Sequence, residues 1–195
     1  DRDYFVNKWL KTKGHGYMGF HSATDTYRTK NPGHRWYQEI AGGTFNGHPW
    51  GAGTTVTISV HDTSHPAMKP FGKEFQIKDE IYQYKPETYV GGDKLRVLVS
   101  LDLNTEQTMK PLNRNEGLKK QYTEGGRTVP VSWIRTFEGG RVFYTNLGHN
   151  ASTYWSPAVL QHYLDGLQYA LGDLRADATP SSKITREEVL APPVP

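Results

Sequence analysis

The sequence of 195 residues contains no cysteine. This absence excludes disulfide frameworks, thiolate nucleophiles, iron–sulfur clusters and cysteine-ligated zinc sites. Long apolar runs are also missing, because no window reaches the roughly 18 consecutive apolar residues of a membrane-spanning helix, and we expect no membrane span. A strong charge of one sign is lacking as well: 23 basic and 20 acidic residues give a net charge of +3, and the basic residues are scattered. A nucleic-acid partner is therefore not expected.

The length suits one domain with a tail. We expect an α/β domain over residues 1–172 and a tail or linker over residues 173–195, because the sequence beyond Asp173 turns polar and ends in LAPPVP. The best-defined helix follows Ser156-Pro157, an N-cap and a proline at the first helical position, and it stops at Gly172. The periodic apolar positions of this helix are Val159, Leu160, Tyr163, Leu164, Leu167 and Leu171.

Several segments have the patterns of β-strands. Residues 54–61 alternate between apolar and polar side chains, which predicts a strand with one polar face. Residues 95–101 are apolar at five of seven positions, the profile of a strand covered on both faces. Residues 129–137 and 141–147 flank a short glycine turn, so they predict an antiparallel hairpin.

The chain opens with a predicted helix over residues 5–10, which leads into a short buried strand over residues 17–20. Polar residues 22–33 then predict a loop, residues 36–40 a short helix, and residues 75–82 a further alternating segment. A βα layer normally begins with a strand, and no strand precedes the first helix. We therefore expect the N-terminal portion of the fold to be missing from this chain or to be supplied by a partner.

Reactive side chains come directly after the predicted strands. His21, His61-Asp62, Asp102 and His149 follow four different strand segments. If most of these strands run parallel in one open sheet, their carboxyl ends share an edge, and ligands of such sheets bind outside that edge. The sequence therefore predicts a functional site there.

Two histidines and two carboxylates are the candidate catalytic groups. His21 stands between a strand and a hydroxyl-rich loop and is interpreted as a general base or metal ligand, with Asp25 as the carboxylate that orients it. The alternative for His21 is a hydrogen-bonded loop histidine. His149 follows Gly148, whose backbone freedom would turn the imidazole toward a ligand, and we interpret it as the opposite acid–base partner. Glu80 lies among apolar residues, where partial burial raises a carboxyl pKa; a solvated strand edge is its alternative.

Aromatic and polar residues around these positions are candidates for binding a substrate. Residues 42–50 form a glycine-rich loop that could cover a ligand with Trp50 as a stacking face, although Trp50 could instead pack inside the fold. The candidate substrate-binding residues are Thr24, Tyr27, His48, Trp50, Tyr82, Asp102, Asn150 and Trp155.

No cofactor motif is present, since HExxH, EF-hand, GxSxG and phosphate-loop patterns are all absent. A divalent metal stays an open alternative, with His21, His48 and His149 as its candidate ligands.

Seven segments, taken in order, resemble the trehalose-utilisation (ThuA-like) family. They are GYMGFHSATDTY, WYQEIAGGTFNGHPW, HDTSHPAM, FQIKDEIYQY, LRVLVSLD, PVSWIRTFEGGRVFYTNLGH and GLQYALG. The resemblance covers residues 5–172 and implies a flavodoxin-like three-layer open sheet, similar to that of class I glutamine amidotransferases. Those enzymes carry a cysteine nucleophile where this chain has His21, and Pro-Glu after their histidine where it has Asn150-Ala151. The resemblance therefore implies no glutamine hydrolysis here.

The resemblance also implies a role in carbohydrate metabolism, with a disaccharide, glycoside or keto-sugar as the partner. The favoured hypothesis is histidine-based acid–base chemistry on such a sugar. A non-catalytic carbohydrate-binding module and a metal-dependent sugar hydrolase stay open as alternatives. The compartment is undetermined, although the proline-rich end and the expected missing portion favour an extracytoplasmic protein over a cytoplasmic one.

Overall fold

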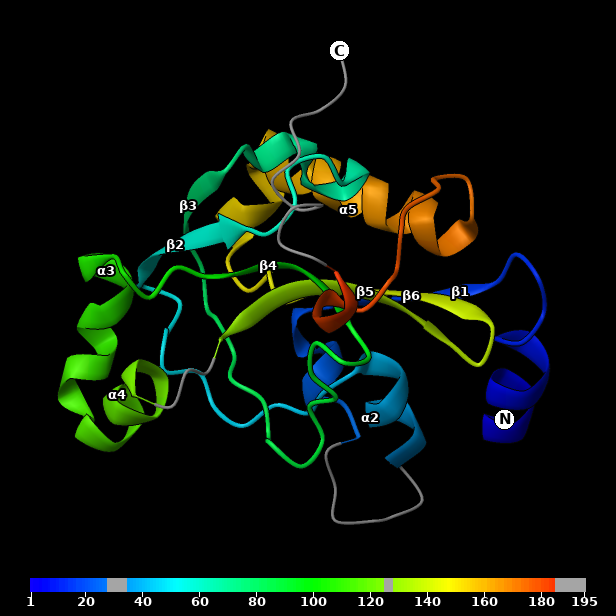
Figure 1. Ribbon diagram of the computed structural model, residues 1–195, viewed down its shortest axis with the longest axis horizontal. Coiled ribbons are helices and arrows are strands. Elements are labelled where there is room, and N and C mark those ends of the chain that lie inside the picture. The colour runs from blue at the N-terminus through cyan, green and yellow to red at the C-terminus, as the bar shows by residue number, and fades with distance from the viewer. Residues whose placement is uncertain (28–34, 125–127, 185–195) are drawn as a thin grey trace.

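The computed structural model describes residues 1–27, 35–124 and 128–184; part of the loop expected at 22–33 and the end of the expected tail, 185–195, lie outside these ranges. A six-stranded sheet with the order β1-β6-β5-β4-β2-β3 forms its centre (Figure 1). The strands are β1 (Gly16–Phe20), β2 (Thr55–Val60), β3 (Glu74–Lys78), β4 (Arg96–Leu101), β5 (Pro130–Phe137) and β6 (Gly140–Thr145).

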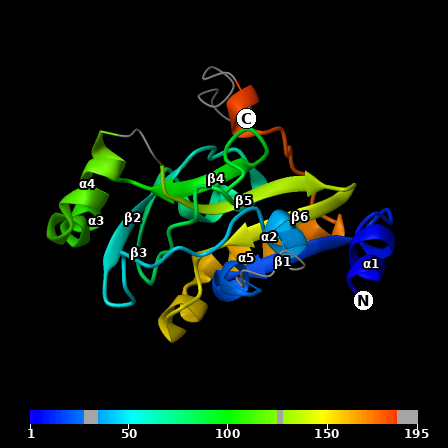
Figure 2. The same ribbon diagram turned by 90° about the horizontal axis from the view of Figure 1, so that it is seen from below.

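Helices cover both faces of this sheet. The α-helices are α1 (Arg2–Tyr4), which continues as a π-helix over Phe5–Trp9, α2 (Arg35–Ala41), α3 (Glu106–Met109), α4 (Glu116–Thr123) and α5 (Pro157–Leu171). Successive residues of a strand point to opposite faces. On β6, Val142 packs with Ile40 of α2, whereas Phe143 lies against Gly166 of α5. Figure 2 shows α2 in front of this part of the sheet and α5 behind it. The predicted three-layer α/β fold is therefore confirmed.

The expectation of a mostly parallel sheet is wrong. Among the strands of the described residues, β1 and β6 pair in parallel, and the other neighbouring pairs are antiparallel. The short turn between β5 and β6 accounts for one of these pairs, because such a link can only join antiparallel strands, whereas β4 and β5 are antiparallel across a long connection that contains α3 and α4. The carboxyl ends of β1, β3, β4 and β6 therefore lie at one edge of the sheet, and those of β2 and β5 lie at the other.

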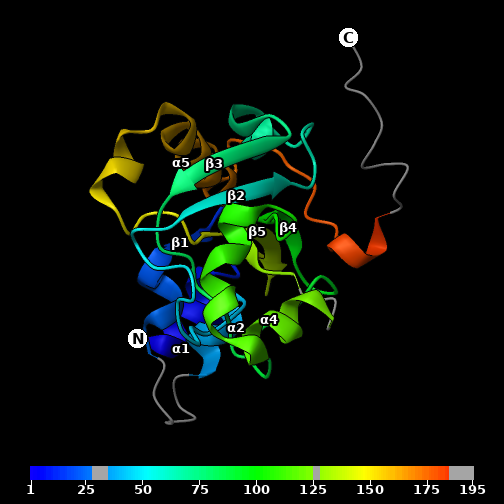
Figure 3. The same cartoon turned by 90° about the vertical axis from the view of Figure 1, so that its left-hand side faces the viewer.

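Two strand predictions differ in outcome. All six residues of β4 are buried, which confirms the strand covered on both faces. The polar face expected for β2 is covered by α3 at Thr57 alone, while Thr55 is exposed and Ser59 half-buried. The Thr57 backbone N–H donates to Thr108 Oγ1 at 2.9 Å, and Thr57 Oγ1 accepts from Gln107 at 2.7 Å. Figure 3 shows α3 and α4 standing on this side of the molecule.

The long helix α5 has the predicted ends but buries only part of the predicted apolar face, Val159 and Tyr163. Ser156 precedes it, and Gly172 ends it with a φ of 95°. Its four leucines, expected in the core, are 45–55% exposed: Leu160, Leu164, Leu167 and Leu171. The helix packs through the predicted Val159 and also through His162 and Gly166, and the lack of a side chain at Gly166 lets the Phe143 ring approach.

The segment after α5, predicted to be a tail, packs on the body of the fold as far as Ser182. Leu174, Ala176 and Ala178 contact the main core. Backbone pairing continues, because the Ser181 N–H donates to the Leu95 carbonyl at 2.9 Å. Within the described ranges, every helix is too short or too polar to span a bilayer.

Candidate functional site

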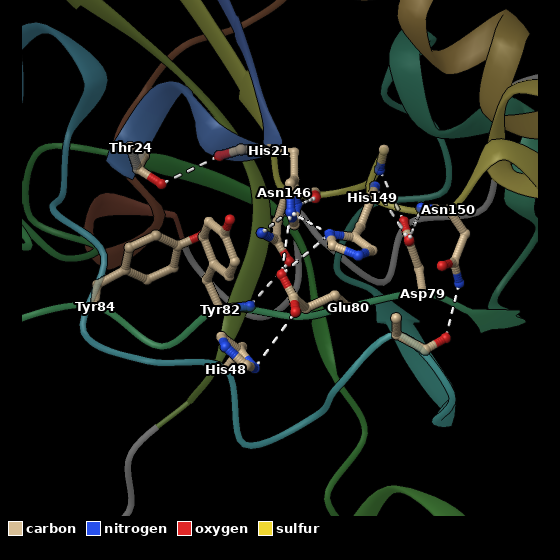
Figure 4. Close-up of polar contacts among 12 residues, drawn as sticks. His21, Thr24, His48, Asp79, Glu80, Tyr82, Tyr84, Asn146, His149 and Asn150 are labelled. Carbon is tan, nitrogen blue, oxygen red and sulfur yellow. Dashed lines mark hydrogen bonds and ion pairs between the residues drawn. The ribbon is translucent and has the colours of Figure 1, made fainter. Parts of the chain in front are cut away.

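Three strands that end at the same edge of the sheet bring His21, Glu80 and His149 together (Figure 4). His21 directly follows β1, Glu80 comes two residues after β3, and His149 comes four residues after β6. His48 joins them from the glycine-rich loop. We call His21, Glu80 and His149 the His–Glu cluster.

Glu80 is the centre of this site. Its Oε2 lies 3.3 Å from His21 Nε2 and 3.2 Å from His149 Nδ1, and the two imidazole nitrogens are 3.3 Å apart. Its other oxygen, Oε1, lies 3.3 Å from His48 Nδ1. The side chains of His21 and Glu80 are 9% and 10% exposed, whereas those of His149 and His48 are 42% and 52% exposed. The site therefore has a buried base and two imidazoles that face solvent.

His21 is held in one orientation from both sides of its ring. Its backbone adopts a φ of 33°, a left-handed conformation that costs about 1–3 kcal/mol and often marks functional turns. His21 Nδ1 lies 2.7 Å from the Asn146 carbonyl oxygen, which can only accept, so Nδ1 donates and carries the proton. The Tyr82 ring lies 4.3 Å from the imidazole, centroid to centroid. Nε2 is thereby directed at Glu80.

The backbone of His21 is supported by a tyrosine beneath it. The Tyr144 hydroxyl donates to the His21 carbonyl at 2.9 Å. Burial raises the pKa of Tyr144 to about 12, so this hydroxyl keeps its proton at neutral pH.

A fully buried carboxylate, Asp79, positions the loop that carries His149. Its Oδ2 accepts from the Gly148 N–H at 2.7 Å, and its Oδ1 accepts from the N–H groups of His149 and Asn150 at 3.1 and 2.8 Å. Successive N–H groups that converge in this way form an anion nest. Asp79 is not among the candidates predicted from the sequence; the Asp79-Glu80 pair after an alternating segment was the available signal.

Asn146 is a second positioning residue that the sequence reasoning missed. Its side chain is fully buried, and its Oδ1 accepts from the Tyr82 N–H at 3.1 Å. Its carbonyl holds His21, so this one residue ties the β1, β3 and β6 ends together. Nothing in its local sequence distinguishes it from an ordinary loop asparagine.

Three expected site residues are structural instead. Trp50 is fully buried and donates from Nε1 to the Thr108 carbonyl at 2.7 Å, so it offers no face to a sugar. Thr24 is 1% exposed and hydrogen-bonds the Tyr144 hydroxyl at 2.9 Å. Asn150 uses its side-chain amide on the carbonyls of Ala52 and Lys78, at 2.8 and 2.9 Å.

Other candidates lie apart from the cluster. The orienting role predicted for Asp25 belongs to the Asn146 carbonyl, which accepts from His21 Nδ1. Asp102 stands at the same sheet edge but accepts from the Asn104 backbone in its own turn, at 2.9 Å. His61 and Asp62 follow β2 and therefore lie at the opposite edge, where Asp62 pairs with Arg96 at 2.7 Å.

Of the remaining aromatic candidates, one contacts the cluster and two lie elsewhere. Tyr82 lies against His21, with the ring centroids 4.3 Å apart. Tyr27 packs its ring against Tyr37, with centroids 5.2 Å apart. Trp155 is 81% exposed on the short helical turn Ala151–Trp155 after the His149 loop.

The cluster offers three ligand atoms to a metal ion, and two of its residues, His21 and His149, are among the three candidate ligands predicted from the sequence. His21, Glu80 and His149 each offer a ligand atom, and these atoms all lie within 4.8 Å of one another. His48 contacts the far oxygen of Glu80, so Glu80 takes the place predicted for His48 in the set. A neighbouring cavity of about 530 Å³ is lined by Pro49, Gln107 and Arg114, among others, and by none of the cluster residues.

Comparison with known proteins identifies the family. The model of a family described as ThuA, trehalose utilisation, matches residues 6–170. No curated protein matches the chain. A putative ThuA-like protein from Bacteroides uniformis shares 22% identity at a TM-score of 0.62, over 93% of this chain and 67% of its own.

A putative ThuA-like protein from Parabacteroides merdae shares 16% identity at a TM-score of 0.56, over 93% of this chain and 70% of its own. At such identities these two structures establish the fold alone. The family match spans most of the chain, from the first helix to the end of α5. The chain therefore belongs to the ThuA family of trehalose utilisation.

Proposed function

We propose that this protein processes a small carbohydrate by proton-transfer chemistry at the His–Glu cluster. The observation that carries the proposal is Glu80, a 10% exposed carboxylate whose Oε2 lies within 3.3 Å of two imidazole nitrogens. Imidazoles exchange protons near neutral pH, and a carboxylate in contact with them can take or return a proton. The family match supports a carbohydrate as the substrate class.

The exposed fractions of the side chains suggest a different role for each residue of the cluster. His149, with 42% of its side chain exposed, is the imidazole that reaches a bound sugar, and Glu80 behind it receives the proton. His21 is fixed through Nδ1, and its Nε2 lies 3.3 Å from Glu80 Oε2. This arrangement suits removal of a proton from a sugar hydroxyl, or from a carbon next to a sugar carbonyl, and its return at a leaving oxygen.

A non-catalytic carbohydrate-binding module is the second candidate function. It is favoured by Trp155, whose ring is 81% exposed close to the site and could stack on a sugar. In that case the histidines would serve only to hold the loops.

Turnover of a panel of disaccharides, glycosides and their keto derivatives, followed by chromatography, tests the proposal. We expect Glu80→Gln and His149→Ala to lower kcat/KM by about 100-fold or more, the range of general acid–base catalysis. His15→Ala removes a histidine near the N-terminal helix and is the matched control, with unchanged turnover. Wild-type turnover in Glu80→Gln would overturn the catalytic assignment, and sugar binding without product would favour the binding module.

A further inference from the structure

We infer that the His–Glu cluster is a binding site for one divalent transition-metal ion, ligated by His21 Nε2, His149 Nδ1 and Glu80 Oε2. The inference deepens the proposed function, and the catalytic meaning of the ion rests on that proposal. Ion binding itself stands on the geometry of the three side chains.

The three ligand atoms form a triangle of the size that one metal ion requires. Its edges are 3.2, 3.3 and 3.3 Å. Bonds of about 2.0–2.2 Å to nitrogen and oxygen, at angles of about 90–110°, place neighbouring ligand atoms about 2.8–3.6 Å apart. An ion above the triangle can therefore reach all three atoms without a rearrangement of the site.

The positions of the protons in the site also favour a bound cation. His21 donates from Nδ1 to the Asn146 carbonyl at 2.7 Å, so in the neutral imidazole Nε2 presents a lone pair. That lone pair faces a carboxylate oxygen and a second imidazole nitrogen, both at 3.3 Å. One proton can lie along only one edge of the triangle, whereas a cation satisfies all three atoms at once.

Each ligand is also held from behind, as the ligands of metal sites usually are. The Asn146 carbonyl fixes His21, and His48 contacts the second oxygen of Glu80 at 3.3 Å. Asp79 accepts from the backbone N–H of His149 at 3.1 Å. These contacts hold the three ligand atoms in place before an ion binds.

The donor set selects the class of metal. Two imidazole nitrogens and one carboxylate oxygen suit Zn²⁺, Mn²⁺ or Fe²⁺, whereas Ca²⁺ and Mg²⁺ prefer oxygen ligands alone. Three protein ligands leave at least one position for water or substrate. The exposed side of the cluster lies at His149, so a sugar oxygen could reach an ion there and be polarised by it.

Calorimetric titration of the chelator-treated, dialysed protein with ZnCl₂, and separately with MnCl₂, tests this site. We expect one equivalent to bind at pH 7, and His149→Ala or Glu80→Gln to weaken the binding by about 10-fold or more. His15→Ala removes one histidine outside the cluster and should bind as the wild type does. Equal affinity in the wild type and both cluster variants, or no binding of either ion, would overturn the inference.

Activity measurements separate this inference from the proposed function. Sugar turnover that persists unchanged in chelator, yet is lost in Glu80→Gln, would overturn the catalytic role of the ion and leave the acid–base proposal standing. Stoichiometric metal binding at the cluster without turnover of any sugar in the panel would do the reverse. Circular dichroism of each variant at 25 °C identifies any loss that comes from unfolding.

Discussion

At the scale of single residues, His162 is a polar group placed entirely inside an apolar layer. It is fully buried on α5, with its ring 5.1 Å from that of Phe71 and 5.0 Å from that of Phe143. Its one hydrogen-bonding partner among the described residues is the Ala67 carbonyl, at 2.9 Å from Nδ1. Burial lowers the pKa of His162 to about 4, because the charged imidazole would lose its hydration.

This shift predicts how stability depends on pH. An unfolded histidine titrates near pH 6.5, so between about pH 6.5 and 4 the unfolded chain binds more protons than the folded one. The free energy of unfolding is therefore highest above this window and falls on acidification, by about 2–3 kcal/mol from His162 between pH 7 and 4.5. Urea denaturation at these two pH values should show a smaller fall in His162→Phe. An equal fall in both proteins would contradict the buried neutral histidine.

The residues of the site differ in how far the sequence reveals them. His21 and His149 are recognisable because each follows a strand-like segment, and Glu80 because it stands in an apolar setting. Asp79 and Asn146 act through backbone groups about 65–70 residues away, so their roles exist only after the fold has formed. Trp50 could not be assigned for the opposite reason: a tryptophan after a glycine-rich loop suits a stacking face and a core position equally.

At the scale of elements, the direction of the strands decides which residues meet. The sequence reasoning placed His61 with His21 on the assumption of a parallel sheet. Because β2 runs antiparallel to both β3 and β4, its carboxyl end lies away from the site, while the end of β3 delivers Glu80 to it. Hydrophobic alternation locates a strand but carries no information on its direction. The sequence pattern therefore could not predict which of these residues meet at the site.

Helix α5 offers a test of close packing between elements. A Cβ built on Gly166 would lie 2.5 Å from the Phe143 ring, too close for any real contact. We expect Gly166→Ala to destabilise the protein by about 1–3 kcal/mol through overpacking, despite the better helix propensity of alanine. Gly117 on α4 is the matched control, because its Cβ would meet only Asn115 Oδ1, at 3.4 Å.

Gly117→Ala should therefore leave stability unchanged or raise it by up to about 1 kcal/mol. Thermal and urea unfolding of the two variants compare the effects directly. Stabilisation by both substitutions would show that α5 can move away from the sheet at no cost.

At the scale of the whole molecule, the two edges of the sheet have different tasks. The edge where β1, β3 and β6 end carries the His–Glu cluster. The opposite edge is closed by the segment after α5, where Asp177 lies 3.6 Å from Arg96 and Ser181 Oγ accepts from the Val97 N–H at 2.9 Å. Composition alone predicts a solvated tail there, since the apolar contacts come from Leu174 and two small alanines spaced among charged residues.

Truncation distinguishes a packed segment from a solvated tail. Removing residues 174–195 takes away the apolar contacts of Leu174, Ala176 and Ala178 and leaves the 6% exposed Arg96 with Asp62 as its remaining partner. We expect the free energy of unfolding to fall by about 2–4 kcal/mol, because apolar burial and one ion-pair contact of a buried charge are lost. Removing only residues 185–195 spares every one of these contacts and is the shorter truncation for comparison, and urea unfolding followed by tryptophan fluorescence measures both. If the longer truncation is as stable as the shorter one, the segment is a tail after all, and the opposite edge of the sheet needs no cover.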